Sequence, residues 1–189
     1  MSDLWTTKEV EDVAKRACEK SEGFLVKHGE VTPVAHIFGN QDPLTKERRK
    51  FLTITALVMP EGTKDATARV LQQTCRAVDA SAIVTVMESW VRTIDDAALQ
   101  AMHDKHGSPL DMNGFQKWVN SERRYALLKE TVEPKEAIVI CAEHGRRRFQ
   151  WQMFFTRNPD GKPVLGEWER EEGGMKGRFA NLLTGARGS

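Results

Sequence analysis

The sequence predicts an α+β domain in which helices pack on a mixed, mainly antiparallel sheet. Three observations lead to this class. Strands and amphipathic helices follow one another in the order α β β α β, then a helical stretch, then β β β. The last three strands are joined by short turns, which suit antiparallel neighbours. The 189 residues, 40% hydrophobic and 29% charged, suit one domain with a sizeable core.

The first helix is expected to begin after Thr6 and to end at Gly29. Thr6 and Glu9 have the spacing of a capping box, in which each side chain accepts from a free backbone N–H at the helix start. Glycine at position 29 is typical of a helix end. The residues expected on the buried face are Val10, Val13, Ala14, Ala17, Cys18, Phe24 and Leu25.

Two strands with a charged loop between them come next. Residues 31–40 (VTPVAHIFGN) predict a short strand, which Pro33 places near a sheet edge because proline cannot donate to a strand ladder. Residues 40–50 (NQDPLTKERRK) predict the loop. Residues 51–60 (FLTITALVMP) predict a strand rich in β-branched residues.

A second helix and a long apolar strand complete the first half. Helical spacing is expected over residues 63–79, and residues 81–91 (SAIVTVMESWV) have the nearly continuous apolar pattern of a central strand covered on both faces. The buried face of the helix is expected to hold Ala66, Val70, Leu71, Cys75 and Val78.

Residues 93–130 interrupt this order with helical patterns on either side of a loop, and they are predicted to be a helical insertion between two strands. Strands are expected again at 136–143, 146–157 and 164–171. Residues 1–172 are therefore expected to form one domain. Residues 173–189, which are basic and rich in glycine, are expected to form a flexible tail.

Composition excludes several classes of function. A net charge of +1 gives no overall field that would attract nucleic acid or a membrane surface. The N-terminus shows no signal peptide, and no run approaches the about 18 apolar residues that span a bilayer. The three cysteines, Cys18, Cys75 and Cys141, are far apart and lack a CxxC pair. We therefore expect a cytosolic protein with reduced thiols and no membrane partner.

Two stretches, 77–91 (AVDASAIVTVMESWV) and 133–145 (EPKEAIVICAEHG), resemble a family of uncharacterised bacterial and phage proteins. In that family a helix leads into an alanine-rich strand that ends Glu-x-Trp, and Pro-x-x-Glu-Ala opens the next strand. The similarity covers about residues 45–165, and the helical stretch at 93–130 departs from it. The resemblance implies the α+β class and no particular activity. The matching positions are Glu88, Trp90, Pro134, Glu136 and Ala137.

Four residues at predicted strand ends are candidates for acid/base catalysis: Glu88, His36, Glu143 and His144. Glu88 shares a strand face with apolar residues, and burial there would raise its pKa towards the range that suits a general acid or base. Its structural alternative is an ion pair with an arginine. Glu143 and His144 are neighbours on one strand, so they point to opposite faces and cannot easily act together.

No cofactor or metal is expected from the sequence. It contains no P-loop, no G-x-G-x-x-G and no H-E-x-x-H. His103 and His106 lie one helical turn apart, but a zinc site needs three or four ligands with supporting contacts.

The stretch 146–157 predicts a half-buried strand with a basic outer row. Arg147, Phe149, Trp151, Met153 and Phe155 alternate onto the core face. The opposite face holds Arg146, Arg148, Gln150 and Gln152, which are donors of the kind that contact phosphates and bases, and Arg48 and Arg49 could extend it. Pairing of Arg146 and Arg148 with Glu167 and Glu169 across the next hairpin would neutralise the row.

The leading functional prediction is a non-enzymatic binding or accessory module with an unknown protein partner or an oligomeric state. One alternative is an enzyme with an acid/base site around Glu88. The other is a nucleic-acid-binding protein that uses the Arg146/Arg148 face. Phe179, Leu182 and Leu183 in the tail suit either docking in the groove of a partner or packing on the chain's own sheet.

Overall fold

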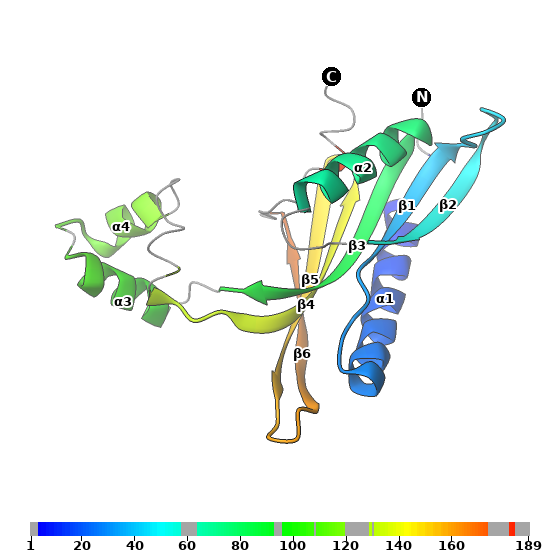
Figure 1. Cartoon of the computed structure of the whole chain (residues 1–189). Coiled ribbons are helices and arrows are strands. Elements are labelled where there is room, and N and C mark those ends of the chain that lie inside the picture. Colours follow the sequence, from blue (N-terminus) through cyan, green and yellow to red (C-terminus); the bar gives the residue numbers. More distant parts are fainter. Residues whose placement is uncertain are drawn as a thin grey trace. The chain divides into compact units, whose positions relative to one another are not determined.

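Six strands form one antiparallel sheet in the computed structural model, in the order β2-β1-β3-β4-β5-β6, and the predicted α+β class is confirmed (Figure 1). Along the chain the elements are α1 (Thr7–His28), β1 (Val34–Gln41), β2 (Arg48–Ala56), α2 (Lys64–Ala77), β3 (Ala80–Val91), α3 (Asp96–His106), α4 (Met112–Val119), β4 (Lys135–His144), β5 (Arg147–Arg157) and β6 (Pro163–Glu172).

The structure describes residues 4–57, 64–92, 96–107, 109–119, 129, 131–173 and 182–183. The chain divides into two compact units, one of Met1–Ser89 with Ala137–Ser189 and the other of Trp90–Glu136. Within the second unit, α3 and α4 bury a small cluster of Leu99, Met102, Phe115 and Val119. The described residues between β3 and β4 outside those strands are helical or loop and form no further strand, so the helical insertion between two strands is confirmed.

Both predicted ends of α1 are confirmed. The Thr6 side chain accepts from the backbone N–H of Glu9, and the Glu9 carboxylate accepts from the backbone N–H of Thr6. At the other end Gly29 has φ 78°, the left-handed conformation that glycine adopts without strain, and its N–H donates to the carbonyl of Leu25.

The alternation of the strands sends apolar side chains to both faces of the sheet. On one face α1 packs over a core to which β5 contributes Phe149, Trp151, Met153 and Phe155, as its alternation predicted. On the opposite face α2 packs over Ala35 and Ile37 of β1 and Ile83 of β3. The central position of β3 is likewise confirmed, because β1 and β4 flank it.

Residues 31–40 lie near a sheet edge, as expected, but not at the edge itself. β1 lies second in the sheet, and β2 forms the edge. Pro33 precedes β1, so its missing N–H removes no bond from the ladder, and its carbonyl accepts from the N–H of Leu57 at 2.8 Å. The charged loop is also shorter than expected because β2 begins at Arg48.

Three apolar side chains that were expected to be buried are instead exposed: Ala66 and Val70 of α2 and Phe24 of α1. Val70 lies outside the buried face of α2, which the residues Ala68, Leu71 and Cys75 form. Phe24 of α1 is 50% exposed. In both helices the apolar pattern is wider than the stripe that contacts the sheet.

A close approach at Gly39 provides a test of this packing. A Cβ atom at position 39 would lie 2.8 Å from the Cβ of Val78 and 2.9 Å from the Val78 carbonyl oxygen. We expect Gly39→Ala to lower the free energy of unfolding by about 1–3 kcal/mol. Gly23 of α1 has open space around its Cα, so Gly23→Ala should raise it by about 0.5–1 kcal/mol. Urea unfolding of both variants checks this, and equal effects would contradict the close approach.

Candidate functional site

Glu143, one of the four acid/base candidates, holds the C-terminal segment of the chain. Its buried carboxylate accepts from the backbone N–H of Leu182 at 2.9 Å and from that of Leu183 at 3.2 Å. Both leucine side chains lie in the core on the α2 face. These two residues therefore pack on the chain's own sheet, whereas Phe179 and the remainder of the predicted tail beyond Gly173 lie outside the described residues.

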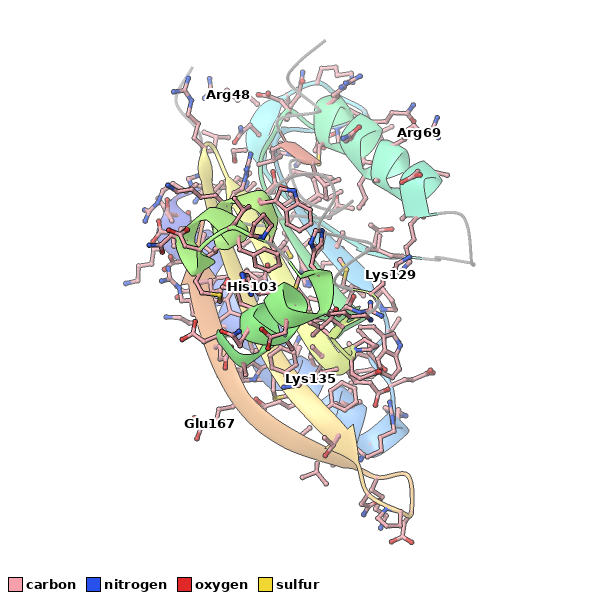
Figure 2. The ribbon with its side chains drawn as sticks, turned by 90° about the vertical axis from the view of Figure 1, so that its left-hand side faces the viewer. Arg48, Arg69, His103, Lys129, Lys135 and Glu167 are labelled. Atoms are coloured by element: carbon pink, nitrogen blue, oxygen red, sulfur yellow. The ribbon has the colours of Figure 1, made fainter. Side chains whose placement is uncertain are left out.

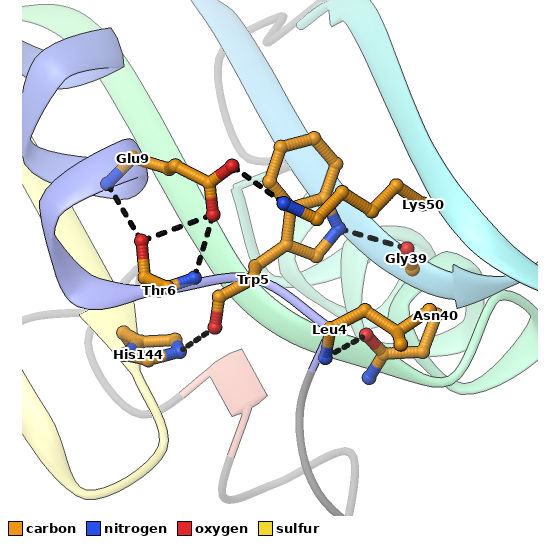
Figure 3. Close-up of polar contacts among 8 residues, drawn as sticks. All are labelled: Leu4, Trp5, Thr6, Glu9, Gly39, Asn40, Lys50 and His144. Atoms are coloured by element: carbon orange, nitrogen blue, oxygen red, sulfur yellow. Dashed lines mark hydrogen bonds and ion pairs between the residues drawn. The ribbon is translucent and has the colours of Figure 1, made fainter.

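His144 fixes the N-terminus of α1 (Figure 3). Its Nε2 lies 3.1 Å from the carbonyl oxygen of Trp5, which can only accept, so Nε2 carries the proton. Its Nδ1 then accepts from the Thr7 hydroxyl at 2.9 Å. Further along the same segment, the Trp5 indole N–H donates to the carbonyl of Gly39 at 2.9 Å. Both ring nitrogens of His144 are thus engaged in holding the helix.

Glu88 lies in a polar cluster at the far end of α1. One carboxylate oxygen pairs with Arg157 at 3.3 Å, and the other accepts from the N–H of Val31 at 3.2 Å. Arg157 also donates to the carbonyl of Gly29 at 2.9 Å. The ion pair with an arginine is therefore present, and it ties β3 and β5 to the connection between α1 and β1.

The four acid/base candidates do not converge. His36 pairs across the sheet with Val84, four residues before Glu88, which is about 13 Å along the strand. The Gly145 N–H donates to the carbonyl of Ser81, so the end of β4 lies about 23 Å along β3 from Glu88. The prediction that His36 closes a strand is also wrong, because it is the third residue of β1.

The predicted basic row on β5 is interrupted by internal hydrogen bonds. Gln152 is buried and donates to Glu169 at 3.0 Å, and Gln150 donates to Gln152 at 3.1 Å. The register sets Glu169 opposite Gln152, so the alternative in which Arg148 pairs with this glutamate does not hold. Glu167 projects from β6 (Figure 2).

The arginines of the row lie in two separate places, at the start of β2 and at the turn into β5. Arg49 pairs with Asp42, and Arg147, which alternation sets on the other face of β5, pairs with Glu172 at 2.9 Å. Arg48 and Arg49 begin the edge strand β2, and three strands, β1, β3 and β4, lie between β2 and β5 (Figure 2 labels Arg48). Arg146 is exposed and Arg148 is half-buried.

His103 and His106 serve the small cluster between α3 and α4. His103 contacts the ring of Phe115 edge-on at 5.0 Å, and His106 does the same with Trp118 at 4.6 Å. His103 also bonds to the carbonyl of Leu110 at 2.8 Å. No group of three or more His, Cys, Asp or Glu residues within the described ranges could hold a metal ion.

The three cysteines are unpaired. Cys18 and Cys75 are buried, and Cys141 is half-buried. Burial raises the pKa of each thiol to about 12. They are protonated at neutral pH, which does not suit a nucleophile.

A cavity of about 340 Å³ opens between α1 and the sheet, beside the hairpin of β1 and β2. Three exposed apolar side chains line this cavity: Leu52 and Ile54 of β2, which are 41% and 61% exposed, and the half-exposed Phe24 of α1. The residues that line it are Val13, Arg16, Ala17, Lys20, Ser21, Phe24, Val31, Thr32, Val34, His36, Leu52, Ile54 and Val86.

The cavity follows from the width of the sheet. Strands about 4.8 Å apart place the axes of β2 and β6 about 24 Å from each other, whereas a helix with its side chains is about 10 Å across. Polar contacts join α1 to β6, where Trp168 donates to Glu22 and Arg170 pairs with Glu11 at 3.0 Å. At this position α1 leaves Leu52 of β2 partly uncovered.

His36 supplies a polar group to this apolar cavity. It lies on β1 between Ile54 of β2 and Val84 of β3. Its Nδ1 is buried and has no hydrogen-bond partner among the described residues. Burial lowers the pKa of His36, and the Lys20 ammonium lowers it further, so the ring is neutral at pH 7.

Two cations that the sequence analysis did not single out line the same cavity. Arg16 and Lys20 lie one turn apart on α1 and are exposed. Within the described part of the chain neither forms an ion pair, and none of the described lining residues carries a carboxylate. The signal that could have found them is their i, i+4 spacing beside the apolar positions Val13 and Ala17.

Comparisons with protein-family models, with curated proteins and with solved structures found no match. The family resemblance of the two sequence stretches therefore stays a prediction. No helix within the described ranges has the length and apolar character needed to cross a membrane. The evidence for a binding site is therefore the geometry of the cavity between α1 and the β1–β2 hairpin.

We expect the stability of the fold to depend on pH because of two carboxylates, Glu9 and Asp42, that contact the β1–β2 hairpin. Lys50 and Thr6 hydrogen bonds lower the pKa of Glu9 from 4.5 to about 2, and backbone N–H groups of Thr45 and Leu44, with Arg49, lower that of Asp42 from 3.8 to about 2. A carboxylate whose pKa falls on folding stabilises the fold above its unfolded pKa. This contribution is lost as the pH falls from about 4.5 to 2.

The urea midpoint at pH 7 and at pH 3 measures this loss. Glu9→Gln should show a smaller drop between the two pH values than the unsubstituted protein does. Glu171→Gln, at an exposed position of β6, serves as the control and should follow the unsubstituted protein. An unchanged drop in Glu9→Gln would contradict the role given to the Glu9–Lys50 contact.

Proposed function

We propose that the chain is a cytosolic, non-enzymatic binding module that takes an apolar ligand in the cavity between α1 and the β1–β2 hairpin. Ligand sites are concave, mostly apolar and provided with a few polar groups that fix orientation. This cavity has those features: apolar side chains from four elements, one histidine and two cations.

The proposal rests on two features of the cavity. Apolar side chains at its border are exposed, and one polar atom inside it, Nδ1 of His36, is buried without a partner among the described residues. Apolar surface stays exposed to water at Leu52, Ile54 and Phe24, although closer packing could have buried it. The buried Nδ1 of His36 lacks a partner among the described residues, which costs free energy unless a bound group supplies one. A ligand with an apolar body and one polar group would relieve both costs.

The enzyme alternative has weaker support. A general acid or base needs a reacting partner within hydrogen-bond distance. Glu88, Glu143 and His144 are each engaged with backbone or side-chain partners, and they lie at separate places in the sheet. His36 is the one member of the four that lines the cavity.

The nucleic-acid alternative also has weaker support. The hydrogen bonds of Gln150 and Gln152 remove two of the expected donors from the row, and Asp42 neutralises Arg49. Arg146 and Arg148 alone would offer two phosphate contacts, and nucleic-acid affinity grows with the number of such contacts.

Titration with N-phenyl-1-naphthylamine, a neutral apolar dye that fluoresces when it leaves water, tests the proposal. We expect saturable binding of one dye per chain. Ile54→Glu should weaken binding about tenfold or more, because it sets a carboxylate against the apolar body of the dye.

Val70→Glu is the matched control, since Val70 is 59% exposed on α2 at the opposite face. It should leave dye affinity unchanged, and both variants should keep the urea midpoint of the unsubstituted protein. Absence of saturable dye binding, or equal weakening in the two variants, would contradict the proposal.

A further inference from the structure

The cavity has an apolar interior and a cationic border. Val34 and Val86, paired across β1 and β3, lie on the sheet side, and Val13 and Ala17 face them from α1. Arg16 and Lys20 lie on the same helix at exposed positions. A ligand that satisfies both parts needs an apolar body and an anionic end.

The charge at this border is uncompensated within the described part of the chain. Two cations that other elements bring to α1 are paired, since Lys50 contacts Glu9 at 2.5 Å and Arg170 contacts Glu11 at 3.0 Å. Arg16 and Lys20 have no such partner among the described residues. Two neighbouring cations in front of a low-dielectric wall attract an anion, and a guanidinium matches the two oxygens of a carboxylate.

His36 adds a hydrogen-bonding group to this border. Lys20 and His36 both line the cavity, and the pKa of His36 is lowered mainly by burial and further by the Lys20 ammonium. A neutral imidazole can carry its proton on Nδ1 and donate it. An anionic oxygen that contacts Lys20 would therefore have a donor from His36 within the same space.

We propose that the cavity binds a free monocarboxylic acid with an apolar chain, its carboxylate held by Arg16 and Lys20 and its chain buried beside Leu52 and Ile54. This inference rests on the proposed function and names the ligand class. A neutral apolar ligand would leave both cations and the His36 ring unused. A phosphate-rich ligand would find only two cations and would place polar groups against apolar walls.

Displacement of N-phenyl-1-naphthylamine by decanoate and by decanol tests the ligand class. The two compounds have chains of the same length and differ in the charge of the end group. We expect decanoate to displace the dye at about a tenfold lower concentration than decanol does, because its carboxylate gains charge-assisted hydrogen bonds. The preference should shrink at high salt, which screens exposed charges.

The double variant Arg16→Gln/Lys20→Gln should reduce the preference for decanoate over decanol to about onefold. Lys15→Gln/Lys27→Gln removes the same two charges from α1 at exposed positions outside the cavity lining, and it should keep the preference. Lys20→Gln alone serves as a milder variant if the double variant unfolds.

Several outcomes would overturn the inference. Equal displacement by decanol and decanoate would do so while leaving the proposed function intact, because the dye would still bind. If both double variants lost the preference for decanoate over decanol equally, that preference would come from the net charge of the protein alone. Tighter binding of a short peptide with an apolar C-terminal residue would overturn the assignment to a free acid.

Discussion

A single helix of the described chain, α1, covers one face of a sheet that is six strands wide, and this mismatch of widths governs the structure around it. The helix packs over β3, β4 and β5, and β5 supplies Trp151 and Phe149 to the core beneath it. Covering the centre buries the largest apolar side chains. It also means that the two edges of this face are covered by different means.

The edge at β6 is closed by long polar side chains. Trp168 donates its indole N–H to Glu22, and Arg170 pairs with Glu11 while it lies 5.0 Å from the ring of Phe149. At the other edge the N-terminus of α1 is held by Trp5 and by the Glu9–Lys50 contact. Beyond this point the helix and the hairpin separate, and the cavity occupies the space between them. The borders are fixed by specific bonds, so the open volume belongs to the fold.

Local features were predictable from the sequence because each depends on neighbouring residues. The capping box of Thr6 and Glu9 involves one helical turn, and the faces of β5 follow from strict alternation around Trp151. Features that join distant segments were not predictable. The carboxylate of Glu143 accepts from residues 39 and 40 positions later, and Glu88 pairs with Arg157 across 69 positions. The sequence suggested an arginine as a partner of Glu88, but it could not identify which arginine.

The candidate site was only partly predictable for the same reason. His36 was singled out by residue type, but its expected companions lie elsewhere. Phe24 was assigned to the core because it is apolar and correctly spaced, although the sheet edge leaves it half-exposed. Arg16 and Lys20 read as ordinary exposed cations of a helix. Only the position of α1 relative to β2 brings them to a common cavity.

The central claim is that ligands enter the space between α1 and the β1–β2 hairpin. Methyl-resolved NMR of a protein labelled at isoleucine, leucine and valine, titrated with decanoate, tests it most directly. The account predicts shifts at Val13, Val34, Leu52, Ile54 and Val86, with Leu71, Ile83, Leu182 and Leu183 on the opposite face unchanged. Shifts spread evenly over both faces, or none at the cavity, would contradict it.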